Sequence, residues 1–260
     1  SVTFATRGQV TNPLLDPNVR LVIAHRGNRI AAPENTVTAL RQAVDLGADA
    51  IEFDVRLTRD GIPVLMHDAD LDRTTSARGR VSSYLLSELE QMNAGARFPG
   101  NDGSQHPIPT LEEVLDAFRA TPMVIEVKER RAAEPTERLV RKFGLQMRIL
   151  IGSAERGVME WFYRTGLPTC ASMLDAALLI PIALLGLTPA KPRYDVLSVT
   201  PEYHGFRIPI PRMARAARRA GVPTQVWTIN DPSEARLLWA EGISGIVTDD
   251  PAALLRARSG

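Results

Sequence analysis

Four short apolar runs in the sequence end in side chains capable of acid–base or metal chemistry. They are Ile23-Ala24-His25-Arg26-Gly27, Ile51-Glu52-Phe53-Asp54-Val55, Val64-Leu65-Met66-His67-Asp68 and Val124-Ile125-Glu126-Val127-Lys128. In barrels of parallel strands, polar residues at the carboxyl ends of the strands form the active site. We therefore expect the histidines, carboxylates and cations of these runs to share one site.

The carboxylates of two runs have the spacing of neighbours on one face of a strand. Glu52 and Asp54 are two residues apart, so their side chains face the same way, and so do those of Glu126 and Lys128. Buried carboxylates need a charge partner or a metal. Oxygen ligands suit a hard ion, so we predict one divalent metal ion, Mg2+ or Ca2+, on Glu52, Asp54 and Glu126. The alternative is a salt-bridge cluster of the same carboxylates with Arg26 and Lys128.

The position of His67 depends on a predicted hairpin. Asp60-Gly61 is a strong signal for a two-residue turn between antiparallel strands. With that turn Arg59 pairs with Ile62, and Asp54 then lies opposite His67 on the same face. A shift of one residue in this pairing would turn His67 to the other face.

Together these residues predict a phosphate ester as the substrate. A carboxylate-bound metal with Arg26 and Lys128 makes a positive pocket that suits a phosphate. The two histidines, His25 and His67, can act as acid and base near neutral pH. The combination describes metal-assisted cleavage of a phosphate ester, although Lys128 can also serve only to neutralise Glu126.

A repeated unit predicts the elements that must position these side chains. A helical pattern ends in glycine and a β-rich run follows, at 45–53, 142–151, 164–172, 219–227 and 240–248. Glycine suits the position just after a helix, and short apolar runs suit strands buried on both faces. About eight strands in 260 residues favour an α/β fold of the (β/α)8 TIM-barrel type. No glycine-rich phosphate loop supports the alternative, a doubly wound open sheet.

The barrel domain is expected to span residues 21–260, after an N-terminal extension at 1–20. A stretch at about 68–109, rich in Asp, Arg, Ser, Thr and Gly, interrupts the alternation after the third strand. We interpret it as a small insertion on the rim of the barrel.

Composition excludes several other classes of protein. Lys and Arg number 31 against 30 Asp and Glu, so a net charge of +1 gives no case for nucleic acid as a partner. The lone Cys170 excludes an internal disulfide framework and a cysteine-rich metal site. A free cysteine and no signal peptide in residues 1–20 favour the cytoplasm. Removal of a signal before Ser1 would instead make the protein secreted or periplasmic.

One apolar segment, residues 176–187, allows two interpretations. It is shorter than the roughly 20 residues that cross a bilayer, and Pro181 interrupts it. It is either a buried helix of the domain or a surface helix that contacts lipid or a second subunit. The oligomeric state stays open.

Ten short motifs resemble those of one enzyme family. They are His-Arg-Gly (25–27), Pro-Glu-Asn-Thr (33–36), Glu-x-Asp-Val (52–55), Asp-Gly-x-Pro-Val (60–64), His-Asp (67–68), Leu-x-Arg-Thr-Thr (71–75), Ile-Pro-Thr-Leu-Glu-Glu-Val-Leu (108–115), Glu-x-Lys (126–128), Trp-Thr-Ile-Asn (227–230) and Thr-Asp-x-Pro (248–251). Over about residues 21–255 the chain resembles the glycerophosphodiester phosphodiesterases.

This resemblance implies a barrel that hydrolyses glycerophosphodiesters to glycerol 3-phosphate and an alcohol with a divalent metal. It implies that Glu52, Asp54 and Glu126 hold the metal, that His25 and His67 are the acid/base pair, and that Arg26 and Lys128 bind phosphate. In the family mechanism the glycerol hydroxyl attacks phosphorus, and water then opens the resulting cyclic phosphate. Which histidine is the acid, and which alcohol leaves, are not read from the sequence.

Several weaker assignments accompany the resemblance. Trp227 is predicted to line the glycerol pocket, with core packing as the alternative. Glu34 and Asn35 either cap the next helix or orient His25 and the substrate, and Asp249 is expected to anchor the loop that closes the barrel. Two other functions stay open. One is a related phospholipase D-like barrel enzyme acting on lysophospholipids or sphingolipids, like the sphingomyelinase D group, and the other is a phosphate-binding barrel without turnover.

Overall fold

Parallel strands form the wall of a barrel in the computed structural model, which describes residues 12–100 and 102–259. Neighbouring strands follow the order β5-β4-β2-β1-β10-β9-β6, and β3 pairs only with β2. The strands are β1 (Leu21–His25), β2 (Ala50–Leu57), β3 (Pro63–Leu65), β4 (Met123–Val127), β5 (Ile149–Gly152), β6 (Leu197–Val199), β9 (Thr224–Val226) and β10 (Gly245–Thr248).

A very short segment closes the barrel between β5 and β6. Thr169 forms a parallel bridge with Ile151 of β5, and Cys170 forms one with Val196 beside β6. The backbone N–H of Cys170 donates to the carbonyl of Ile151 at 2.8 Å. With these two residues as its eighth parallel segment, the sheet closes, and the predicted (β/α)8 barrel is confirmed.

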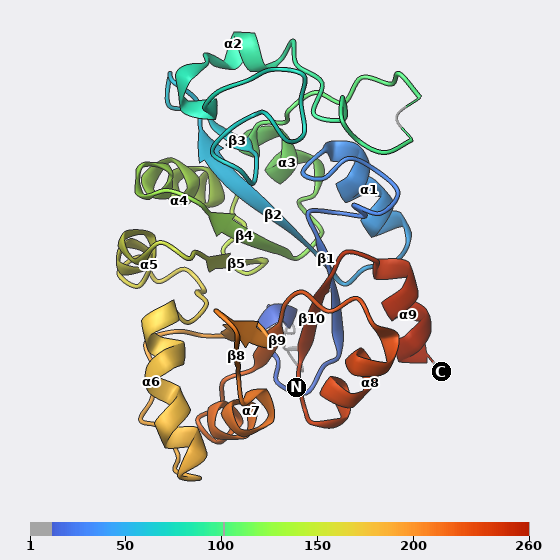
Figure 1. Cartoon of the computed structure of the whole chain (residues 1–260). Coiled ribbons are helices and arrows are strands. Elements are labelled where there is room, and N and C mark those ends of the chain that lie inside the picture. The colour runs from blue at the N-terminus through green and yellow to red at the C-terminus, as the bar shows by residue number, and fades with distance from the viewer. Residues whose placement is uncertain (1–11, 101, 260) are drawn as a thin grey trace, which may run out of the picture.

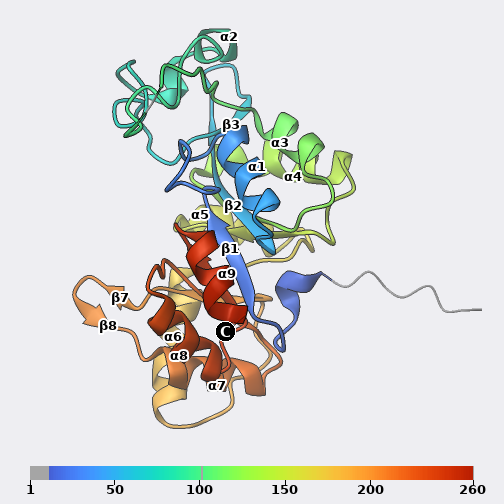
Figure 2. The same ribbon diagram turned by 90° about the vertical axis from the view of Figure 1, so that its right-hand side faces the viewer.

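Helices surround the barrel and bury one face of each strand (Figures 1 and 2). On β2, Phe53 and Val55 pack in the core cluster that also contains Leu115 of α3. Because side chains alternate along a strand, Glu52 and Asp54 face the interior of the barrel. The helices are α1 (Val37–Asp45), α3 (Leu111–Ala117), α4 (Ala133–Lys142), α5 (Arg156–Phe162), α6 (Met173–Leu184), α7 (Ile210–Arg219), α8 (Pro232–Ala240) and α9 (Pro251–Ser259).

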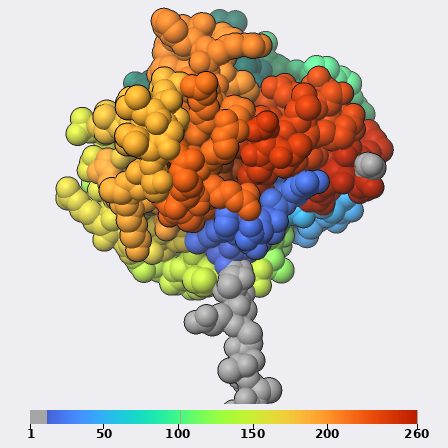
Figure 3. Space-filling model, turned by 90° about the horizontal axis from the view of Figure 1, so that it is seen from below, coloured from blue at the N-terminus to red at the C-terminus, as the bar shows by residue number. Residues whose placement is uncertain are grey.

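A short 3-10 helix, η1 (Pro13–Leu15), covers the end of the barrel at which the strands begin (Figure 3). Leu14 is 1% exposed and belongs to the cluster of apolar residues inside the barrel, with Ile23 and Leu150. The Asn12 side chain donates to the carbonyl of Ile149 at 2.9 Å. Of the predicted N-terminal extension, residues 1–11 lie outside the described residues, whereas residues 12–15 form the floor of the barrel.

The hairpin of β2 and β3 is antiparallel, as predicted, but the predicted register is wrong by one residue. Arg56 pairs with Val64, and the Thr58 N–H donates to the carbonyl of Ile62. The loop therefore has three residues rather than two. The reason lies in Thr58, whose hydroxyl donates to Asp60 at 2.6 Å and accepts from the Ile62 N–H at 2.9 Å.

The segment between β3 and α3 stands above the barrel and carries little regular structure (Figure 1). It contains the 3-10 helix η2 (Val81–Ser83) and the short helix α2 (Leu86–Leu89). Leu71 and Ile108 belong to its own small apolar cluster. This segment contains the residues at about 68–109, and their interpretation as an insertion stays a prediction.

The apolar segment at 176–187 lies mostly at the surface, so its interpretation as a buried helix is wrong for most of its length. Within α6 only Leu179 and Ala183 are buried, whereas Leu178 is 60% exposed and Leu185, just beyond the helix, is 73% exposed. Across the described residues, no helix has the length and apolar character needed to cross a membrane.

Two short elements complete the description of the fold. The strands β7 (Glu202–Tyr203) and β8 (Phe206–Arg207) form a small antiparallel hairpin that projects from the barrel (Figure 2). The 3-10 helix η3 (Arg130–Ala132) precedes α4.

Candidate active site

Three carboxylates converge where the middle of β2 lies beside the carboxyl end of β4. These strands are parallel neighbours, with Glu52 opposite Val124 and Asp54 opposite Glu126. One ligand oxygen from each of Glu52, Asp54 and Glu126 lies within 4.8 Å of the others. Glu52 and Asp54 are buried, and Glu126 is partly exposed. The structure therefore brings together the three residues predicted to hold a metal.

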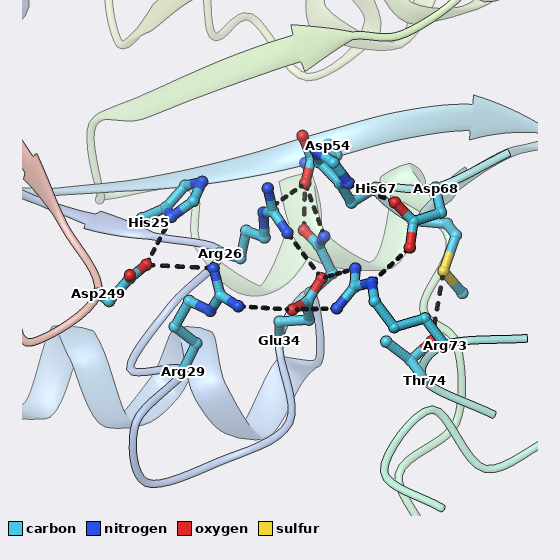
Figure 4. Close-up of polar contacts among 12 residues, drawn as sticks. His25, Arg26, Arg29, Glu34, Asp54, His67, Asp68, Arg73, Thr74 and Asp249 are labelled. Atoms are coloured by element: carbon cyan, nitrogen blue, oxygen red, sulfur yellow. Dashed lines mark hydrogen bonds and ion pairs between the residues drawn. The ribbon is translucent and has the colours of Figure 1, made fainter. Parts of the chain in front are cut away.

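Two cations lie among these carboxylates. Lys128 Nζ is 2.9 Å from Asp54 Oδ1 and 2.8 Å from Glu126 Oε2. Arg26 Nε is 3.1 Å from Asp54 Oδ2 (Figure 4). The Arg26 backbone N–H donates to Glu52 Oε2 at 2.9 Å. The two cationic side chains therefore pair with Asp54 and Glu126, whereas Glu52, among the residues that the structure describes, receives only a backbone N–H.

The unequal sharing of charge separates the pKa values of the cluster. Burial, together with the charges of Asp54 and Glu126, raises the pKa of Glu52 well above its usual value. Burial also acts to raise the pKa of Asp54, but Lys128 and Arg26 outweigh it and bring that pKa down to about 2. Glu52 is therefore the carboxyl group of the cluster that holds a proton most readily.

The donor set fits a hard divalent cation. It consists of carboxylate oxygens from adjacent strands, and one of them, on Glu52, strongly favours a proton when no other cation is near. The ion pairs of the metal-free alternative are also present. However, within the described part of the chain they give Asp54 and Glu126 cationic partners and leave Glu52 with a backbone N–H from Arg26.

His25 ends β1, next to Glu52 of β2. Its Nδ1 lies 2.7 Å from Asp249 Oδ1, and Asp249 also accepts from Asn230 Nδ2 at 2.9 Å. Burial acts to raise the pKa of Asp249, but the hydrogen bonds from His25 and Asn230 outweigh it and lower that pKa to about 2. An ionised carboxylate only accepts hydrogen bonds, so His25 carries its proton on Nδ1 and keeps Nε2 for a substrate.

His67 makes the same contact with a different carboxylate, because its Nδ1 lies 2.7 Å from Asp68 Oδ1. The Arg56 side chain holds the His67 carbonyl at 2.9 Å. His67 lies beyond the last residue of β3, so the alternation of the strand no longer sets its direction. The His67 side chain therefore points toward Asp54, as predicted, although the register is shifted by one residue (Figure 4). Burial lowers the pKa of His67, and Asp54 opposes this effect.

Glu34 and Asn35 do not cap α1, because Thr36 does so by accepting a hydrogen bond from the Ala39 N–H. Asn35 instead donates to Asp54 Oδ2 at 2.8 Å and accepts from the Asp54 backbone N–H at 3.1 Å. Glu34 pairs with arginines, including Arg26 at 2.9 Å. Both side chains therefore contact residues of the candidate site rather than capping the helix.

The glycine after Arg26 permits a close approach of two backbone segments. Gly27 has φ +84°, and a Cβ there would lie 2.5 Å from the backbone carbonyl carbon of Ala39. Only glycine fits this conformation without displacing α1. Gly27 therefore lets the loop after β1 pass against the start of α1.

A cavity of about 250 Å³ opens beside the carboxylates. Its lining includes Glu52, Glu126, Met173, Tyr203 and Trp227. Trp227 is 42% exposed, so its ring forms the wall of a pocket rather than part of the packed core. The structure thus places Trp227 beside the candidate site, as expected for a residue that contacts substrate.

The residues that hold the histidines were not predicted from the sequence. Asp249 was assigned only to the closing loop, and Asp68, Arg29 and Arg73 received no role. Asp68 and Arg73 lie within the motifs His-Asp and Leu-x-Arg-Thr-Thr. The position of Asp68 directly after His67 could have indicated that the two side chains interact. The contact of His25 with Asp249 spans 224 residues, and nothing in the local pattern indicates it.

Comparisons with known proteins agree with this geometry. A family model described as the glycerophosphoryl diester phosphodiesterase family matches residues 25–253. A glycerophosphodiester phosphodiesterase of Caldanaerobacter subterraneus subsp. tengcongensis is 31% identical over 242 residues, covering 90% of this chain and 96% of that protein. A Bacillus subtilis glycerophosphodiester phosphodiesterase is 29% identical and covers 100% of this chain and 92% of that one.

Solved structures lead to the same family. A glycerophosphodiester phosphodiesterase from Agrobacterium tumefaciens has a TM-score of 0.78 at 27% identity and covers 93% of this chain and 100% of that chain. An Oleispira antarctica phosphodiesterase, solved in complex with the product sn-glycerol-3-phosphate, has a TM-score of 0.77 at 26% identity and covers 92% and 97%. With a match over most of its length, the chain belongs to the glycerophosphoryl diester phosphodiesterase family.

Proposed function

We propose that this protein hydrolyses glycerophosphodiesters to glycerol 3-phosphate and an alcohol, using one divalent cation. The observation that carries the proposal is the position of the carboxylate cluster, with Arg26 and Lys128, between two histidines that each contact an aspartate. The relatives named above and the product complex of the Oleispira antarctica phosphodiesterase support it.

Glu52, Asp54 and Glu126 would hold the cation, either Mg2+ or Ca2+. When bound, a divalent cation stabilises negative charge that develops on phosphate oxygens. The bound divalent cation would also weaken the attraction of the carboxylates for Lys128 and Arg26. These two side chains can then direct N–H groups to the phosphate.

The histidines supply the proton transfers. Nε2 of one histidine accepts the proton of the glycerol 2-hydroxyl as its oxygen attacks phosphorus. Nε2 of the other donates a proton to the oxygen of the departing alcohol. A cyclic phosphate results, and water opens it with the two roles exchanged, which gives glycerol 3-phosphate and restores both histidines. General acid–base catalysis contributes roughly 10²–10⁴-fold, so loss of either ring nearly abolishes turnover.

The test is release of glycerol 3-phosphate from glycerophosphocholine, glycerophosphoethanolamine and glycerophosphoglycerol. Each substrate is assayed with Mg2+, with Ca2+ and with EDTA. We expect metal-dependent release that is lost in His25→Ala and His67→Ala. His106→Ala is the matched control, because the His106 ring contacts Thr38, its backbone N–H donates to Asn93 Oδ1, and the residue lies outside the carboxylate cluster. Release that persists in EDTA, or in both active-site variants, would refute this mechanism.

One observation also favours a second candidate function, cleavage of lysophospholipid or sphingolipid phosphodiesters. The wall of the cavity beside Glu126 is formed largely by apolar side chains. They include Met173 and Tyr203, which are 40% and 46% exposed. An acyl chain could follow this apolar wall. Lysophosphatidylcholine assayed beside glycerophosphocholine separates the two, since a true lipid enzyme has the higher kcat/KM for the lipid.

A further inference from the structure

Glu34 is the centre of a cluster of arginines. Its carboxylate lies 2.9 Å from Arg26 Nη1, 3.1 Å from Arg29 Nη2, and 2.6 and 2.9 Å from the two terminal nitrogens of Arg73. The Glu34 side chain is only 9% exposed, so this carboxylate is fixed from three sides. Of the three arginines, only Arg26 also reaches the metal-binding carboxylates.

The other two arginines extend from Glu34 in opposite directions (Figure 4). Arg29 Nη1 lies 3.3 Å from Asp249 Oδ1, the oxygen that contacts His25. Arg73 Nε donates to Asp68, whose other oxygen contacts His67. A continuous chain of contacts therefore joins the two histidines: His25, Asp249, Arg29, Glu34, Arg73, Asp68, His67.

We propose that Arg29, Glu34 and Arg73 are positioning residues that form one brace, which orients His25 through Asp249 and His67 through Asp68. The proposal builds on the proposed function, in which both rings must present Nε2 to the same phosphate. The brace lies beside the substrate site and contacts neither reacting atom. It acts by restricting the two aspartates.

The geometry of Arg73 shows why the brace needs arginine. Its Nε serves Asp68 while both terminal nitrogens serve Glu34, so one planar guanidinium fixes two carboxylates at once. A lysine ammonium has no fork that could hold both in a defined orientation. Arg29 similarly divides its two terminal nitrogens between Glu34 and Asp249.

The orientation of the two aspartates determines which ring nitrogen of each histidine carries the proton. An ionised aspartate held at Nδ1 keeps the proton on that nitrogen, and this sets both the tautomer and the orientation of the ring. Asp68 and Arg73 come from the segment above the barrel, whereas Arg29 and Glu34 come from the loop after β1 and Asp249 follows β10. The brace thus joins three separate segments around the two rings.

Nitrogen NMR of histidine-labelled, metal-free protein tests the proposal without any turnover. The spectra are recorded at a pH at which both imidazole rings are neutral. We expect the wild-type rings of His25 and His67 to carry the proton on Nδ1. Arg73→Met should move His67 toward the Nε2-protonated form and leave His25 unchanged, Arg29→Met should do the reverse, and Glu34→Gln should affect both. Wild-type tautomers in all three variants would overturn the proposal.

Kinetics provide the second readout. Mutation of a residue that orients a metal ligand typically lowers activity about 10–100-fold, and we expect the same range for residues that orient a catalytic histidine. We expect kcat to fall by that factor in Arg73→Met and Arg29→Met, with KM for glycerophosphocholine changed less than about threefold, and Arg73→Lys should fail to rescue. Arg138→Met, which removes an exposed pair with Glu134, should behave as wild type. A loss confined to KM, or full rescue by lysine, would contradict the brace.

Two further measurements keep the result interpretable. Arg73→Gln replaces Arg73→Met if thermal unfolding shows that the methionine variant does not fold. Mg2+ affinity should stay at the wild-type value in the Arg29 and Arg73 variants, because neither side chain contacts Glu52, Asp54 or Glu126. Absence of hydrolysis in the wild-type protein would count against the proposed function alone, since the tautomers are measured independently.

Discussion

Asn35 and Asp54 exchange two hydrogen bonds, one from each residue. Asn35 Nδ2 donates to Asp54 Oδ2 at 2.8 Å, and the Asp54 backbone N–H donates to Asn35 Oδ1 at 3.1 Å. The pair ties the loop after β1 to the middle of β2. Lys128 and Arg26 contact the same carboxylate, so the Asp54 side chain is fixed in place before any metal ion binds.

Replacing Asn35 should therefore weaken both the fold and the metal site. In Asn35→Ala the buried N–H of Asp54 loses its acceptor, which costs about 1–3 kcal/mol of unfolding free energy. We also expect weaker Mg2+ binding, because the Asp54 carboxylate gains freedom. Urea denaturation and calorimetric titration measure the two effects. Asn18→Ala, at an exposed site, is the control, and equal stability of the two variants would contradict this role.

Removing Lys128 should make the protein depend on metal for its stability. Lys128→Met leaves Asp54 and Glu126 without their shared cation, and loss of one partner of a buried pair costs about 3–5 kcal/mol. A divalent cation then supplies the missing charge. We expect the variant to be less stable without metal and to gain more from Mg2+ than wild type does, in denaturation curves with and without the ion. An equal gain in both proteins would disprove the shared-charge account.

The raised pKa of Glu52 predicts an unusual dependence of stability on pH. In metal-free protein the folded state holds a proton on Glu52 at pH values where the unfolded chain, with a pKa near 4.5, has lost it. The free energy of unfolding attributable to Glu52 therefore rises as the pH falls through the folded pKa toward 4.5. Bound metal keeps Glu52 ionised and removes this gain.

The same proton competes with the metal. Below the pKa of Glu52, the apparent Mg2+ affinity should fall roughly tenfold per pH unit, because one proton must leave for each ion bound. Titrations across this pH range measure the slope. Glu52→Gln should bind more weakly with a flatter pH dependence, and an unchanged slope in that variant would assign the proton to another group.

The floor of the barrel offers a test that should affect stability alone. Leu14→Ala leaves a cavity among the apolar side chains inside the barrel and should cost about 2–5 kcal/mol. Leu14 lies at the end opposite the carboxylates, so kcat and KM should stay near wild type once the variant is folded. Leu237→Ala, at a side chain that is 69% exposed, is the comparison and should change stability little.

Much of the fold was predictable because each element carries a local signal. Glycines after helices and short apolar runs mark the alternation of a barrel, and the spacing of Glu52 and Asp54 fixes their shared face. The segment 169–170 shows the limit of this approach, since two isolated bridges leave no strand pattern to read. The sequence also left two interpretations of 176–187 open, a buried and a surface helix, because an apolar run does not reveal which of its faces is covered.

The candidate site was predictable as far as its residues lie at strand ends. The register of the β2–β3 hairpin was not, because the hydroxyl of Thr58 selects a three-residue loop that Asp60-Gly61 alone does not indicate. The partners of the histidines were also beyond local reasoning. Asp249 meets His25 only after the barrel closes, and Arg73 meets Glu34 across 39 residues.

The distribution of the site along the chain has a consequence for how such a protein can diverge. Its carboxylates, histidines, Arg26 and Lys128 all fall within residues 25–128, whereas the cavity wall draws on later residues such as Met173, Tyr203 and Trp227. Mutations of these wall residues can therefore reshape the pocket, provided that Asp249, which contacts His25, is kept. Selection for a substrate with a different alcohol group can therefore act on the later half of the chain. Residues 25–128 can change less, because they supply the reacting groups.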